Sequence, residues 1–249
     1  MADRGDRADP VDVARALVVR RFPDARAAWL GGSVVHGTHT ATSDLDITVL
    51  LPGPPAPFRE SLLQEGWPVE VFAHTGPSLA HYRAKDAGRR QPTMMRLIAD
   101  SVILLDTDGS AEHLQRECRR EVEDGPHPLT SAELAALRYG ITDLLDDLTG
   151  SRDDDERAVV AMSLFNETAE LLLTGAGYWT GTGKGLLVEL REYDGRRGSD
   201  YVSALVEAVR AGVAGDIGPM TAVCDGVLAD HGGRLFEGHR LPGDNPEDC

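Results

Sequence analysis

The spacing of apolar residues changes near the middle of this 249-residue chain, and the change predicts two kinds of structure. In the first half, short alternating or continuous apolar runs predict β-strands at about 27–31, 45–51, 69–72 and 102–105. Helical periods and capping residues predict helices at about 10–22, 59–65, 79–85 and 93–99, and a short helix after residue 33. Residues 1–110 are therefore expected to form an α/β (α+β) domain with a mixed sheet.

The second half follows the period of amphipathic helices, about 3.6 residues per turn. Thr130 and Glu133 form a capping box before a helix whose apolar face extends to Leu148. A second helix over about 155–174 is expected to bury Ala158, Met162, Phe165, Ala169 and Leu172, and further helices are expected over 201–211 and 220–228. Residues 125–242 are therefore predicted to form an all-α helical bundle, and residues 243–249 a frayed tail.

Charge and composition narrow the classes of partner. A formal net charge of −16 argues against a nucleic-acid partner, which needs clustered Lys and Arg, and favours a cationic small molecule drawn by electrostatic steering. The three cysteines lack the spacing of a disulfide framework or a zinc site. No apolar run reaches the roughly 18 residues of a membrane span, and residues 1–10 are charged. We therefore expect a cytoplasmic protein without membrane contact, either a monomer or a homodimer.

The most informative motif is Gly31-Gly32-Ser33, followed by Asp44-Leu45-Asp46. Glycines after a buried strand allow a tight turn whose backbone N–H groups can face a phosphate. Side chains alternate along a strand, so Asp44 and Asp46 share one face, separated by two residues of about 3.3 Å each. Paired carboxylates at this separation are suitable ligands for divalent metal. The motif therefore combines a phosphate-binding turn with a metal site.

Gly31-Gly32-Ser33 and Ser43-Asp44-Leu45-Asp46-Ile47 together resemble the signature of the DNA polymerase β-like nucleotidyltransferase superfamily. Members carry a third acidic residue on a later strand, which the resemblance places at Glu70 in Val69-Glu70-Val71-Phe72. It implies a nucleotidyltransferase domain in which Asp44, Asp46 and Glu70 are catalytic Mg²⁺ ligands. It also implies that Gly32 and Ser33 bind the phosphates of ATP or another NTP. Each acid taken alone is also compatible with the solvated face of a strand.

A looser resemblance covers the second half. The segment from Tyr178 to Gly185 is similar to small antibiotic-type nucleotidyltransferases, such as those that adenylylate aminoglycosides. That similarity implies Lys184 as a triphosphate contact and Glu167 as the general base for the acceptor hydroxyl. Asp143 and Asp146 are competing candidates for the base, although acids on a helix face are usually only solvated.

The expected reaction is Mg²⁺-dependent transfer of AMP from ATP to a hydroxyl of a small molecule, with release of pyrophosphate, in a cleft between the two halves. An aminoglycoside-like antibiotic is the expected acceptor, with antibiotic resistance as the biological role. The alternative is an antitoxin-like or regulatory nucleotidyltransferase that adenylylates or binds a protein partner. A degenerate nucleotide sensor is disfavoured because the set of three carboxylates is intact.

Overall fold

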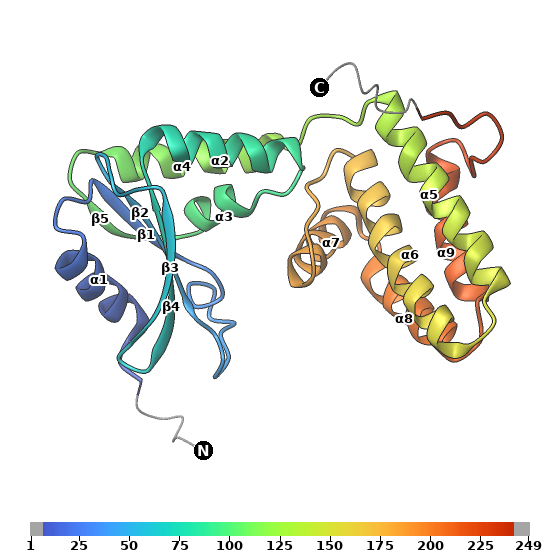
Figure 1. Cartoon of the computed structure of the whole chain (residues 1–249), viewed down its shortest axis with the longest axis horizontal. Coiled ribbons are helices and arrows are strands. Elements are labelled where there is room, and N and C mark those ends of the chain that lie inside the picture. The colour runs from blue at the N-terminus through green and yellow to red at the C-terminus, as the bar shows by residue number, and fades with distance from the viewer. Residues whose placement is uncertain (1–6, 242–249) are drawn as a thin grey trace. The chain divides into compact units, whose positions relative to one another are not determined.

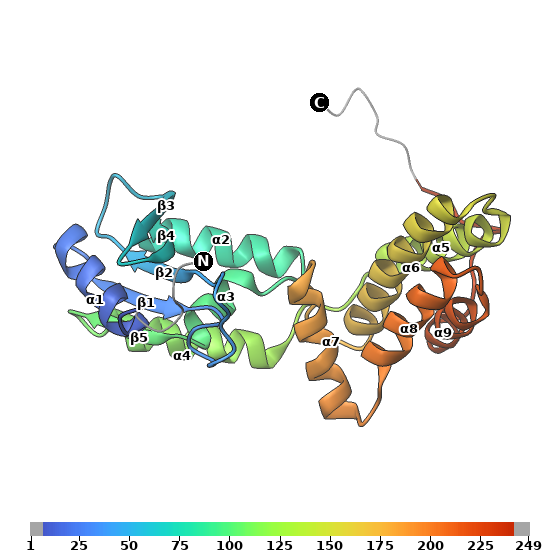
Figure 2. The same ribbon diagram turned by 90° about the horizontal axis from the view of Figure 1, so that it is seen from below.

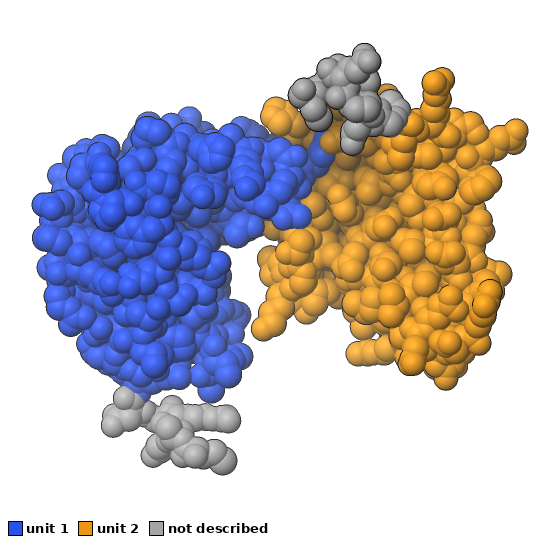
Figure 3. Space-filling model, in the orientation of Figure 1, with its two compact units in different colours: residues 1–125 blue, residues 126–249 orange. Residues whose placement is uncertain are grey.

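The computed structural model describes residues 7–241, and the chain divides into two compact units, residues 1–125 and 126–249 (Figures 1 and 3). Each unit has its own apolar core. The predicted domains, 1–110 and 125–242, left 111–124 unassigned, whereas these residues belong to a helix of unit 1. The tail predicted over 243–249 lies outside the described residues. Within the described part, no helix is both long and apolar enough to cross a membrane.

Unit 1 contains a five-stranded mixed sheet in the order β3-β4-β2-β1-β5. Its strands are β1 (Ala27–Gly31), β2 (Leu45–Leu50), β3 (Phe58–Gln64), β4 (Trp67–His74) and β5 (Val102–Asp106). β2 pairs with β4 in parallel, and the other neighbours are antiparallel. The mixed sheet and the strands expected near 27–31, 45–51 and 102–105 are thus confirmed.

Different helices cover the two faces of this sheet. The face formed by residues such as Leu30, Ile47 and Val71 packs against α1 (Pro10–Arg21) in one apolar core. The opposite face, which carries Asp46 and Glu70, is covered by α2 (Gly76–Gly88), α3 (Thr93–Ala99) and α4 (Ser110–Asp124). Figure 1 shows α1 and α3 on opposite sides of the strands. The functional carboxylates therefore share a face with α2 and α3.

The helix predicted over 59–65 is wrong: these residues form β3, which pairs antiparallel with β4. The turn between the strands is Glu65-Gly66, with positive φ angles of 49° and 80°. A two-residue turn with positive φ at both positions favours a hairpin because its twist matches that of the strands. Pairing with β4 overrides the helical propensity of this charged segment. Residues 33–37 likewise form turns, where a short helix was expected.

Two helices were not predicted, α4 and α7 (Lys184–Arg197). The α4 sequence is mostly charged, and only Ala111, Gln115 and Cys118 are buried on it. The few apolar residues of α4 do repeat at helical spacing, and the helix was overlooked because most of the segment is charged. α4 packs against α3, and the buried Gln115 amide donates to the carbonyl oxygens of Ile98 (3.2 Å) and Ser101 (2.9 Å).

Unit 2 is an all-α bundle of α5 (Ser131–Gly150), α6 (Asp154–Gly175), α7, α8 (Tyr201–Val213) and α9 (Gly218–Asp230). α6 packs against each of the other four helices (Figure 2). It buries Leu164, Phe165, Ala169 and Leu172 among others, whereas Met162 is 49% exposed and Ala158 only half-buried. The predicted buried stripe was therefore wrong at its N-terminal end, where Ala161 faces the core.

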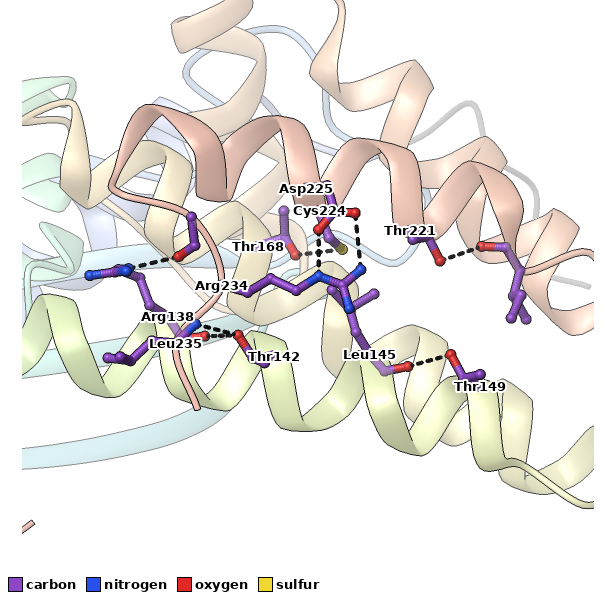
Figure 4. A network of polar contacts seen from close by, with 12 residues as sticks. Arg138, Thr142, Leu145, Thr149, Thr168, Thr221, Cys224, Asp225, Arg234 and Leu235 are labelled. Atoms are coloured by element: carbon purple, nitrogen blue, oxygen red, sulfur yellow. Dashed lines mark hydrogen bonds and ion pairs between the residues drawn. The ribbon is translucent and has the colours of Figure 1, made fainter. Parts of the chain in front are cut away.

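Polar contacts fasten the segment that follows α9 onto α5 (Figure 4). Arg138 of α5 donates from Nε to Gly233 O (2.9 Å) and from Nη2 to Gly232 O (2.7 Å). Thr142 Oγ1 accepts a hydrogen bond from Leu235 N at 3.0 Å. Arg234 pairs through two nitrogens with Asp225 of α9. These contacts satisfy backbone groups that would otherwise need water.

Candidate active site

The strand register places the glycine turn and two of the predicted carboxylates in one row across the sheet. Gly31 of β1 pairs with Asp46 of β2, and Asp46 pairs with Glu70 of β4. Ser61 of β3 continues the row beyond Glu70. Neighbouring strands are about 4.8 Å apart, so the turn and Glu70 flank Asp46 on opposite sides.

Asp44, Asp46 and Glu70 form a cluster of half-buried carboxylates. One oxygen from each lies within 4.8 Å of the others. Carboxylate oxygens are hard donors, and Mg²⁺ binds such oxygens at about 2.0–2.1 Å, so this spacing fits one or two such ions. Among residues 7–241, no other group of three acidic, His or Cys side chains has this geometry. The donor set therefore fits a divalent metal.

The electrostatics around Asp46 favour binding of a cation. Burial, the charge of Asp44 and the charge of Glu70 together raise the pKa of Asp46 to about 6. The guanidinium of Arg59 acts in the opposite direction and lowers that pKa. Without a metal, clustering of these carboxylates costs free energy because like charges are held close in a partly desolvated place.

Arg59 is a site residue that the sequence did not reveal. Its Nη2 donates to Glu70 Oε2 at 2.5 Å, and its guanidinium lies 5.1 Å from the centre of the Phe72 ring. Residue 59 was assigned to a helix, so its side chain could not be placed beside Glu70. The hairpin signal of Glu65-Gly66 was the feature that could have identified it.

The glycine turn is in close contact with Asp46. Gly32 has φ +78°, and a Cβ there would overlap Asp46 Oδ2. A Cβ on Gly31 would come within 2.9 Å of the Leu97 carbonyl oxygen in α3. Ser33 Oγ donates to Ser43 Oγ at 3.2 Å, and Ser43 Oγ accepts from Thr40 N at 2.8 Å. Both glycines are thus required sterically, and the serine links the turn to the segment before Asp44.

A pocket of about 680 Å³ opens beside Asp46 and Glu70. Its lining is Asp46, Pro57, Phe58, Arg59, Glu70, Phe72, His74, Tyr82, Asp86, Arg89, Gln91, Thr93, Met94 and Leu97. These residues come from β2, the segment leading into β3, β3, β4, α2, α3 and the α2–α3 connection. The pocket therefore lies entirely within unit 1.

Glu167 and Lys184 belong to unit 2, and their roles at the active site stay predictions. Glu167 is half-buried on α6, and its carboxylate lies against α5 where a Cβ on Gly140 would overlap it. Burial, followed by the charges of Glu170 and Asp143, raises the pKa of Glu167. Lys184 is exposed at the first residue of α7.

Comparison with known proteins agrees with this geometry. Residues 13–74, which include the turn and all three carboxylates, match the family model of the nucleotidyltransferase domain. Unit 1 therefore contains a nucleotidyltransferase domain, and this domain supports a nucleotidyltransferase activity for the protein. The matched segment is 62 of 249 residues and includes nothing of unit 2.

The other comparisons add little. A crystal structure of a nucleotidyltransferase-like protein from Exiguobacterium sibiricum 255-15 has 11% sequence identity and a TM-score of 0.37. That alignment covers 89% of this chain and 77% of the other. The curated proteins give no match.

Replacing Gly32 by alanine should disrupt the metal site. The new Cβ would overlap Asp46 Oδ2, and the positive φ adds backbone strain of about 1 kcal/mol. We expect Gly32→Ala to lose most of its Mn²⁺ affinity in calorimetric titration while remaining folded by circular dichroism. Gly53→Ala is the matched control, since Gly53 has open space around it. Unchanged Mn²⁺ affinity in Gly32→Ala would show that the turn does not constrain Asp46.

In metal-free protein, Asp46→Asn should increase the free energy of unfolding at pH 8. The folded pKa of Asp46, about 6, lies above the ordinary 3.8, so the folded state binds more protons between these values. Stability due to this group therefore falls as pH rises from about 4 to 6 and stays low above. We expect a gain on the order of 1–2 kcal/mol at pH 8, allowing for solvent screening, and almost none at pH 4.

Urea denaturation in EDTA at the two pH values measures this difference. Asp24→Asn, at an exposed site in unit 1, is the control for loss of one charge. A gain of equal size at pH 4 and pH 8 would contradict the electrostatic origin.

Proposed function

We propose that the protein transfers a nucleoside monophosphate, AMP from ATP, to a hydroxyl of a small-molecule acceptor and releases pyrophosphate. The observation that carries this proposal is the row in which the glycine turn, Asp46 and Glu70 lie side by side. It offers a phosphate-binding turn and a metal-binding cluster at the separation of neighbouring strands. A catalyst for phosphoryl chemistry needs these two parts, because most of its work is positioning and charge neutralisation.

Each residue then has a role that follows from its place. Asp44, Asp46 and Glu70 would hold Mg²⁺, whose charge would neutralise that of the phosphates. Gly32 and Ser33 hold the β- and γ-phosphates at the turn. The acceptor oxygen forms a bond to the α-phosphorus, the bond to the β-phosphate oxygen breaks, and pyrophosphate leaves. The proton of the acceptor hydroxyl goes to a carboxylate base, for which Glu167 is our candidate and Glu70 the competitor.

Long-range steering by the net charge of −16 would raise the encounter rate of a cationic acceptor, such as an aminoglycoside-like molecule, whereas the groups that line the acceptor pocket decide which compound binds there. Lys184 is proposed as a further contact to the triphosphate, since a lysine presents a mobile point charge. Adenylylation or binding of a protein partner is the other outcome against which the reaction must be tested.

Transfer can be detected by mass spectrometry. The full chain is incubated with Mg²⁺, each of the four NTPs, and a panel of cationic and neutral hydroxylated compounds. We expect ATP-dependent addition of AMP to at least one compound, and a loss of about a thousandfold or more in Asp46→Asn, because the amide keeps the volume but removes a metal-binding charge. Wild-type turnover in folded Asp46→Asn would refute the metal assignment, and labelling of protein alone would favour the protein-partner alternative.

Glu167→Gln tests the candidate base separately. We expect kcat to fall by about 10²–10⁴, as is typical for loss of a general base, with Mg·ATP affinity unchanged. Because the pKa of Glu167 is raised, wild-type kcat should also rise with pH until this carboxyl is ionised, and the variant should lose that limb. Asp155→Asn, at an exposed acid of the same helix whose charge does not act on Glu167, is the control. Full turnover in Glu167→Gln would assign the proton to another group.

A further inference from the structure

The aromatic residues of unit 1 are distributed unevenly between core and pocket. Phe22, Trp29 and Trp67 are buried. Phe58, Phe72 and Tyr82 are the remaining Phe, Trp and Tyr side chains of unit 1, and all three line the pocket beside Asp46 and Glu70. Phe58 also packs against Phe22 and the apolar core, so Phe72 and Tyr82 are the rings available to a ligand. A pocket with two partly exposed aromatic rings is suited to a ligand with a ring that stacks.

The position of the pocket favours binding of the acceptor in it rather than binding of pyrophosphate. This step rests on the proposed function. In phosphoryl transfer, the attacking and leaving oxygens lie roughly in line across the phosphorus. The glycine turn lies on the β1 side of Asp46, whereas Glu70 and the other β4 residues of the pocket lie on the opposite side; Leu97 of α3 extends the lining toward Gly31. If the turn holds the phosphates that leave, the incoming hydroxyl must approach from the side of the pocket.

The charges that line the pocket are largely paired with one another. Arg59 pairs with Glu70, and Arg89 Nη2 donates to Asp86 Oδ1 at 2.5 Å. Asp86 is only 4% exposed, and its other carboxylate oxygen accepts from Met94 N at 2.8 Å. These pairings leave no surplus of free carboxylates to attract a polycation once a metal occupies the cluster. The walls of the pocket favour a neutral ligand, whatever the charge of the whole chain.

His74 supplies an unpaired polar atom at the far end of β4. It is 5% exposed and lines the pocket, and its Nε2 has no hydrogen-bond partner among the described residues. Ser78 Oγ donates to Thr75 O and lies 3.4 Å from His74 Nδ1, and we therefore assign the tautomer in which Nδ1 donates to Ser78 Oγ. Nε2 then keeps its lone pair, in agreement with the lowered pKa that burial gives His74. A hydroxyl of a ligand can donate to it.

We propose that this pocket is the acceptor site, which binds a neutral hydroxylated compound with an aromatic ring that stacks on Phe72 and Tyr82. The reacting hydroxyl lies at the Glu70 end, and a second hydroxyl donates to His74 Nε2. The Tyr82 ring packs edge-on against His74 with centroids 5.3 Å apart, so Tyr82, which is 39% exposed, must shift for that bond to form. Glu70 and His74 are four residues apart, about 13 Å of strand, which suits an acceptor of two linked rings.

Binding of 4-nitrophenyl β-D-glucopyranoside, a neutral aromatic compound with several hydroxyls, tests the proposal. It is titrated calorimetrically into the full chain with Mg²⁺ but without nucleotide. We expect saturable binding at millimolar concentration, weakened about tenfold by Tyr82→Ala and by His74→Phe. His74→Phe keeps an aromatic ring in the buried position, so folding is retained while the polar atom is lost. Phe236→Ala removes an exposed aromatic ring of unit 2 and should change nothing.

Four results would overturn the proposal. They are absence of saturable binding, equal binding by wild type and both variants, tighter binding of the dication 2-deoxystreptamine, and weaker binding of α,β-methylene-ATP to Tyr82→Ala with the glucoside unaffected. The last result would show that the pocket binds the nucleotide base instead of the acceptor. Because no turnover is measured, this test can fail while AMP transfer is detected, and it can succeed where transfer is not.

Discussion

The parallel pairing of β2 with β4 is the constraint on which the chemistry of unit 1 depends. It places Asp46 directly beside Glu70, although 23 residues separate them along the chain. Antiparallel pairing of β1 with β2 brings Gly31 to the other side of Asp46. A shift of either register by one residue would turn the carboxylates to the α1 face of the sheet, because side chains alternate along a strand. The apolar residues of the α1 face therefore fix the strand register on which the active site depends.

The site carries a cost that the rest of unit 1 must offset. Three carboxylates are held close together, the pKa of Asp46 is raised to about 6, and His74 Nε2 is buried without a hydrogen-bond partner from residues 7–241. Unpaired buried polar atoms and clustered like charges both oppose folding. They are located on the face toward α2 and α3, while the face toward α1 is a continuous apolar core. One face of the sheet therefore contributes stability through its apolar core, while the other face carries the carboxylates and His74, which can bind ligands.

Unit 2 shows a different distribution of polar groups. Its core surrounds α6, which packs against the other four helices, and its notable polar contacts bind the segment after α9 to α5. Glu167 is the acid of this unit whose pKa is raised, and it faces α5 at Gly140. The room left by that glycine allows a carboxylate between two tightly packed helices. Such an environment makes this carboxylate a stronger base than a fully solvated one.

Features that depend on short spacing along the chain could be predicted from the sequence alone. Gly31-Gly32-Ser33 and Asp44-Leu45-Asp46 identify a turn and two ligands because strand alternation is local, and the helices over 131–150 and 201–213 have complete apolar periods and start or stop signals. Glu70 was found only through a family resemblance, since one acid in a strand carries no local signal. The charged helix α7 has little apolar periodicity, whereas α4 has a regular apolar stripe that its many charges hid.

The position of Arg59 and the lining of the pocket depend on contacts between segments that are distant in sequence. Arg59 reaches Glu70 because residues 58–64 pair with β4, and their local propensity indicated a helix. The pocket draws its aromatic and polar lining from strands and helices that are distant in sequence, so no motif marks it. The physical reason is the same in both cases: pairing between strands and packing against α2 and α3 involve residues many positions apart, whereas a sequence pattern records only what neighbours along the chain require.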